Sequence, residues 1–114
     1  MIQLTDSLST WTTADFKPRF IAEVQRLDGR KLPLQAGLSL SSYALFDDFK
    51  VMVLNTEEDR DFIFVKTGLF YTGIISGCSC ADDPTPLDEQ NEYCEVLFKI
   101  DKCNGMTEVS LLGN

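Results

Sequence analysis

The C-terminal third of the chain contains the pattern that most constrains the fold. Asn104-Gly105 is the strongest short signal for a β-hairpin turn, and the segments on either side of it alternate apolar and polar residues. A two-residue turn at this point would place four apolar side chains on one buried face, with Ile100 opposite Val109 and Phe98 opposite Leu111. A shift of one residue would turn every side chain to the other face, so the pattern predicts which face is buried.

The segments before this hairpin predict further strands of the same sheet. Residues 61–75 and 92–102 are apolar and rich in β-branched and aromatic residues. Residues 49–54 form another apolar segment, which a polar turn joins to the strand beginning at residue 61. Leucines and alanine alternate with polar or small residues over residues 32–40, which predicts a strand with one buried face. A proline and a glycine within this segment place the strand at a sheet edge. Gly68 and Gly73 predict a bulge or bend in the strand at 61–75.

One amphipathic helix is predicted over residues 15–27. Its apolar residues at positions 16, 20, 24 and 27 recur at steps of four, four and three, which places them on one face. Asp15 is the expected N-cap, and Gly29 is expected to end the helix in the left-handed conformation. Residues 1–13 are either a short strand or an ordered arm fixed by Trp11, and the sequence does not choose between these two alternatives.

These elements predict an α+β fold, in which one N-terminal amphipathic helix packs on an antiparallel meander sheet of four to six strands. The alternative architecture is a half-barrel sheet wrapped around the helix. The chain has 114 residues, of which 44% are hydrophobic. A chain of this size and composition is expected to form a single domain, residues 1–114, whose core needs no metal or disulfide.

Charge and composition exclude several classes of function. The net charge of −8 argues against binding to nucleic acid or to an anionic membrane. The chain has no histidine, which is the most frequent general base and metal ligand. It also has no Gly-rich phosphate loop or serine elbow, so no enzyme activity is indicated. Because the first residues do not resemble a signal peptide and no apolar run is long enough to cross a bilayer, we expect a cytoplasmic protein with reduced thiols.

The cysteines are concentrated around a long loop at residues 77–92. If the strands before and after it pair, three of the four cysteines gather at its mouth, namely Cys78, Cys80 and Cys94. With a carboxylate from Asp82, Asp83 or Glu92, three thiolates would form a tetrahedral zinc site. An exposed Cys78 and Cys80 would alternatively exchange thiols or sense oxidants. The structural alternative is that Cys94 is a small core residue and that the other cysteines lie at strand ends and turns.

Cys94 and Cys103 are not expected to form a disulfide. They are nine residues apart on one predicted strand, which separates them by roughly 30 Å. A disulfide requires Cα atoms within about 7 Å of each other. The same distance excludes a zinc site made of all four cysteines.

The loop is also acidic and stiff. Its candidate partner-binding residues are Asp82, Asp83, Pro84, Pro86, Asp88 and Glu89. The prolines lower the entropy that is lost on ordering, and the carboxylates attract Lys and Arg. The acids would also suit calcium or magnesium, but their spacing is not that of an EF-hand, and a solvated loop is the structural alternative.

The favoured function is a non-enzymatic binding or regulatory module that uses this loop to engage a basic protein surface. The alternative partner is a second copy of the chain, in a homodimer formed either through an exposed sheet edge or through the opposite charges of the helix and the loop. The alternative function is a zinc-thiolate or redox-sensing protein that uses Cys78, Cys80 and Cys94. No other cofactor is expected.

Overall fold

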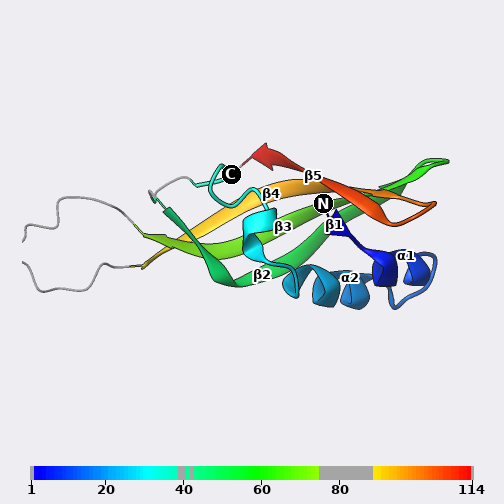
Figure 1. Ribbon diagram of the computed structural model, residues 1–114, viewed down its shortest axis with the longest axis horizontal. Helices are drawn as coiled ribbons and strands as arrows, with labels where there is room; N and C mark the ends of the chain where they lie inside the picture. Colours follow the sequence, from blue (N-terminus) through cyan, green and yellow to red (C-terminus); the bar gives the residue numbers. More distant parts are fainter. Residues whose placement is uncertain (1, 39–40, 42, 75–88, 114) are drawn as a thin grey trace, which may run out of the picture.

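The computed structural model describes residues 2–38, 41, 43–74 and 89–113. Within these residues, five antiparallel strands form one sheet in the order β1-β5-β4-β3-β2, and both helices lie along one side of it (Figure 1). The strands are β1 (Ile2–Gln3), β2 (Tyr43–Glu58), β3 (Phe62–Ile74), β4 (Glu89–Asp101) and β5 (Met106–Gly113). The helices are α1 (Thr5–Thr10), α2 (Phe16–Gln25) and the short 3-10 helix η1 (Gly29–Lys31).

The core lies between α2 and the inner face of the sheet. On β3, residues 63, 65, 69 and 71 are buried, and their neighbours on β4 at 94, 96, 98 and 100 are buried with them. Phe20 of α2 meets Phe98 of β4 edge to face, with ring centroids 5.1 Å apart, and both side chains are fully buried. Burial of each such ring contributes roughly 1.5–3 kcal/mol, so this contact is a main attachment of helix to sheet.

The predicted fold class is confirmed. The chain is α+β, and strands β2 to β5 follow one another in an antiparallel meander that curves into a half-barrel around the helices. The predicted α2 is present, with Phe16, Phe20 and Val24 on its buried face. Asp15 stands at the N-cap position, but its side chain makes no capping hydrogen bond. The spacing of the apolar residues was enough to predict this helix, because those residues form the side that packs against the sheet.

Three of the four apolar side chains predicted for the buried face of the last hairpin lie there: Phe98 and Ile100 are fully buried and Val109 packs against the core, whereas Leu111 is 38% exposed. The predicted register is wrong by two residues. Ile100 faces Thr107, and Phe98 faces Val109. The connection is longer than two residues, because the Gly105 N–H donates to the Asp101 carbonyl at 2.8 Å. Of residues 102–105, Gly105 alone has positive φ, at 76°, whereas the predicted turn needs it at both Asn104 and Gly105. Because side chains alternate with a period of two, a shift of two residues leaves the same side chains on the core side.

The N-terminal segment and residues 32–40 differ from the prediction. Residues 5–10 form α1, an additional helix, after the two-residue strand β1. Residues 32–37 are a series of turns and do not form an edge strand. Leu32 and Leu34 are buried as predicted, at 3% and 0% exposure, but their side chains enter the core from this turn segment rather than from a strand. Residues 39 and 40 lie outside the described part of the chain.

Two glycine predictions also need correction. The irregular pairing predicted for β3 occurs on its neighbour β2, where the register shifts between Leu45 and Lys50 and again between Val53 and Asn55. Gly29 does not end α2 in the left-handed conformation; it begins η1, where the Asp28 carboxylate accepts the N–H of Arg30. Glycine is required at this position because a Cβ atom would lie 2.4 Å from the Phe46 carbonyl oxygen.

Candidate functional site

Most of the predicted site residues lie outside the described part of the chain. These are Cys78, Cys80, Asp82, Asp83, Pro84, Pro86 and Asp88. Glu89 is the first residue of β4, and it pairs with Ile74, the last residue of β3. The chain therefore leaves the sheet and returns to it at the same end. The predictions that involve these residues remain predictions.

Cys94 and Glu92 are described, and both are buried on the inner face of β4. The thiol of Cys94 is fully buried and free of disulfide bonding, while Cys103 is exposed in the turn after β4. Glu92 is 3% exposed, and its Oε2 accepts the N–H of Ser41 at 2.8 Å and the Ser41 hydroxyl at 2.7 Å. This carboxylate therefore attaches the segment before β2 to the centre of the sheet, which is a structural role.

The buried thiol is covered by the turn segment 32–38. The Tyr71 hydroxyl donates to the Leu34 carbonyl at 2.7 Å and lies close to Cys94. A Cβ atom on Gly37 would lie 2.9 Å from the Cys94 sulfur, so the backbone rests directly on the thiol. Burial raises the pKa of Cys94, and burial likewise raises the pKa of Tyr71. At neutral pH the described surroundings therefore favour the protonated thiol rather than the thiolate that a metal requires.

Among the described residues, no group of three or more Cys, Asp or Glu side chains is close enough to hold a metal ion. The three-cysteine zinc prediction depends on Cys78 and Cys80, so the described residues do not test it.

The most prominent surface feature of the described sheet is its outer face, opposite the helices, which we call the open face. The register places Tyr43, Met52, Phe70 and Tyr93 on this face, next to the even-numbered positions of β3. Tyr43 is 59% exposed, Phe70 43% and Met52 42%. Exposed aromatic and methionine side chains that adjoin one another are typical of protein interaction surfaces.

Phe70 and Tyr93 form the centre of the open face. They pair across β3 and β4, and their ring centroids are 4.7 Å apart. The Tyr93 ring also covers Gly68, where an added Cβ atom would lie 2.9 Å from the ring. The Tyr93 hydroxyl donates to Glu95 at 2.8 Å, and desolvation, followed by this carboxylate, raises the pKa of Tyr93 to about 12. Tyr93 is therefore a neutral, fixed aromatic surface at physiological pH.

Charged side chains also lie along the open face. Lys66 lies 3.8 Å from Glu95, and the Lys99 ammonium lies 4.2 Å from the centre of the Phe62 ring. Five of the ten basic residues belong to the helical layer, on the other side of the sheet, namely Lys17, Arg19, Arg26, Arg30 and Lys31. The register places three further lysines, Lys50, Lys66 and Lys99, at open-face positions, so the basic residues are divided between the two sides of the sheet.

The sequence analysis did not identify the open face. A signal was present, because β3 has phenylalanines at positions 62, 64 and 70 as well as buried apolar residues at the alternate positions. A strand that is apolar on both faces is expected either to be buried on both faces or to have an interface on one of them.

Comparison with known proteins does not add to this geometry. No protein-family model matches the chain, and neither the curated proteins nor the solved structures include a match. In the described part of the chain, no helix combines the length and the apolar character needed to cross a membrane.

Proposed function

We propose that this protein is a non-enzymatic binding module and that a protein with a basic surface docks on its open face. The observation that supports this proposal is the exposed aromatic centre formed by Phe70 and Tyr93. Its neighbour Met52 extends the apolar area across β2. A large ring already held by a fixed neighbour loses little entropy when a partner covers it, so it is well suited to anchor an interface.

The charge of the partner follows from the charge of the chain. At a net charge of −8, the long-range field attracts basic surfaces and speeds their association. The acidic segment 77–92 completes the binding surface in this proposal, because its attachment at Ile74 and Glu89 is close in sequence to the central Phe70 and Tyr93. The contact with the partner would thus combine an apolar centre with a charged margin.

The proposal is tested by co-purification with three matched forms of the protein. Proteins retained by the tagged wild type should be lost with Phe70→Thr, which keeps a strand-forming residue but removes the ring. They should be retained with Lys31→Gln, a change on the helical layer. About 0.5 M salt should weaken retention, because screening shortens the reach of the charges. Retention that is equal for Phe70→Thr and the wild type would contradict the proposal.

A separate variant tests the role of the acidic segment 77–92. Replacement of Asp82, Asp83, Asp88 and Glu89 by their amides should lower the association rate with a purified basic partner and flatten its salt dependence. An unchanged rate would remove the acidic segment from the proposal and leave the open face alone as the docking surface.

A second candidate is self-association through β5. Among the described residues, β1 pairs only with Met106 and Thr107, so the edge of β5 from Glu108 onward has no neighbouring strand there. Leu111 and Leu112 on this segment are 38% and 49% exposed. An uncovered apolar edge is a template for pairing with a second strand. The opposite edge, β2, is less suitable because it has two register shifts and two backbone N–H groups capped by glutamine side chains.

Sedimentation separates this candidate from the first. A dimer formed by β5 edges should dissociate in a Leu111→Pro variant, which removes a backbone donor from the free edge, and should persist in Phe70→Thr. A protein that remains monomeric at about 0.1 mM would dismiss the edge dimer. The zinc or redox alternative is tested separately, by elemental analysis and thiol titration of natively purified protein. The cytoplasmic location remains a prediction, which fractionation of cells would test.

A further inference from the structure

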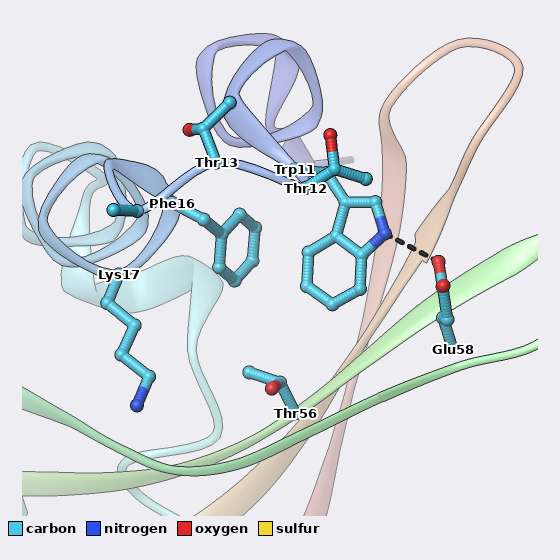
Figure 2. A pocket seen from close by; sticks show the side chains of 8 residues that line it. Trp11, Thr12, Thr13, Phe16, Lys17, Thr56 and Glu58 are labelled. Carbon is cyan, nitrogen blue, oxygen red and sulfur yellow. Dashed lines mark hydrogen bonds between the residues drawn. The ribbon is translucent and has the colours of Figure 1, made fainter.

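A cavity of about 330 Å³ opens between the α1–α2 connection and β2, away from the open face (Figure 2). The rings of Trp11 and Phe16 form one wall of it, and Thr56 lies across from them. The Lys17 side chain extends along one side and Glu58 lies on the other. This volume is at the lower end of the range for pockets that bind small molecules.

The aromatic wall is held in place before any ligand arrives. Trp11 Nε1 donates to Glu58 Oε2, and Lys102 Nζ lies 2.8 Å from the same oxygen. The hydrogen bonds from Lys102 and then from Trp11 lower the pKa of Glu58. Phe16 is buried and meets Trp11 edge to face, with centroids 4.7 Å apart and an interplanar angle of 83°. The hydrogen bond to Glu58 and the contact with Phe16 together hold the indole in place.

The corner beside the indole has a strained backbone. Thr12 has φ of 77°, a conformation that β-branched residues rarely adopt. The Thr13 hydroxyl donates to the Thr10 carbonyl at 2.7 Å, which holds this corner against α1. Such strain persists only where the surrounding structure enforces it, and it concentrates at ligand sites.

The cavity has an unmatched positive charge. Glu58 already has Lys102 as its counter-ion, whereas Lys17 forms no ion pair within the described residues. We propose that this cavity binds a small aromatic carboxylate, whose ring packs against Trp11 and whose carboxylate meets the Lys17 ammonium. A flat ring fits the indole face in an offset stack, and an anion matches the free ammonium.

Trp11 reports directly on this cavity because it is the only tryptophan of the chain. Phenylacetate should change its fluorescence in a saturable way, with a dissociation constant on the order of millimolar, as expected for so small a ligand. Phenylacetamide, which has the same ring without the charge, should bind more weakly. Lys17→Gln should weaken phenylacetate binding about fivefold, the value of one exposed ion pair, and should leave phenylacetamide unchanged.

Lys31→Gln is the matched control, because it removes a lysine of the helical layer that does not line the cavity. It should bind phenylacetate as the wild type does. The proposal is overturned if phenylacetate produces no saturable change, if phenylacetamide binds equally well, or if Lys17→Gln and Lys31→Gln have the same effect. Because the cavity and the open face share no residue, either proposal can fail without the other.

Discussion

At the scale of single residues, the open face depends on one close contact. Gly68 has no side chain, and the Tyr93 ring occupies the space above it. The same ring contacts Phe70, so the arrangement of two aromatic residues depends on one glycine. In a strand, glycine weakens local structure, and a ring from the neighbouring strand that covers it offsets this cost.

The first prediction concerns this glycine. Gly68→Ala should destabilise the protein by about 1–3 kcal/mol, because the added methyl group forces the Tyr93 ring to move. In a Tyr93→Ala background the same change should be neutral or stabilising, since alanine restricts the unfolded chain more than glycine does. Urea unfolding of the four forms gives the coupling energy. Equal effects in both backgrounds would show that the ring does not occupy this space.

The second prediction concerns alkaline pH. The pKa values of Tyr71, Tyr93 and Cys94 are raised in the folded state, in each case first by burial. The folded state thus holds protons that the unfolded state releases. Below the ordinary thiol pKa of about 8.5, these groups contribute their full share to the free energy of unfolding. This contribution should fall as pH rises above that value and through the ordinary tyrosine pKa of about 10.

Tyr71→Phe tests this dependence. The variant should lose about 1 kcal/mol at pH 7, because the Leu34 carbonyl loses its donor, and its stability should fall less steeply between pH 8 and 11. Tyr43→Phe, at an exposed position, should follow the wild-type curve. The measurement is the urea midpoint as a function of pH. A wild-type midpoint that does not fall over this range would contradict the assignment.

The roles of single residues were only partly predictable from the sequence. Cys94 was weighed both as a zinc ligand and as a core residue, and its complete burial beside Tyr71 agrees with the core role in the described surroundings. Glu92 belonged to an acidic stretch, but its bond to Ser41 is made across 51 positions of the chain. Composition along the chain cannot reveal a partner at such a separation.

At the scale of elements, α1 shows how a helix can depend on its neighbour. It has six residues, and its N-cap residue Leu4 makes no side-chain cap. The cap comes from α2 instead: Glu23 accepts the N–H of Ser7 at 2.9 Å, the Ser7 hydroxyl at 2.7 Å and the N–H of Asp6 at 3.2 Å. So short a helix is not stable alone, so a local sequence pattern could not identify it.

The third prediction is that Glu23→Ala destabilises the protein by about 1–2 kcal/mol, the cost of a lost N-cap together with unsatisfied donors. Hydrogen exchange should accelerate at the amides of Asp6 and Ser7 before it changes in β3 or β4. Glu57→Ala, which removes an exposed acid from β2, is the control and should change stability by less than about 0.5 kcal/mol. Unchanged exchange in α1 would contradict the cross-helix cap.

The elements that the sequence did predict have a common property. Helix α2 and the strands from β2 to β5 each bury a periodic apolar face, and this periodicity is local information. The turn segment 32–37 was mistaken for a strand because its leucines alternate, although their burial arises from turns. The hairpin register was missed for a related reason, since turn length changes the register without changing which side chains face the core.

At the scale of the whole molecule, the fold has two unlike sides. The helical layer covers the inner face of the sheet and contains half of the basic residues, while the described chain leaves the outer face uncovered (Figure 1). The predicted α+β class follows from the elements, but the open face follows only from their arrangement. Its apolar centre is the main support for the proposed binding role, and the net negative charge supports the proposed basic partner.

Site-specific photo-crosslinking in living cells tests this claim most directly. A photoreactive phenylalanine analogue placed at position 70 should give discrete adducts with a partner protein, and the same analogue at position 31 on the helical layer should give none. Adducts at position 70 should also decline when the acids of the 77–92 segment are replaced by amides. Adducts at position 31 without adducts at position 70 would contradict the account, because the partner would then dock on the opposite side of the molecule.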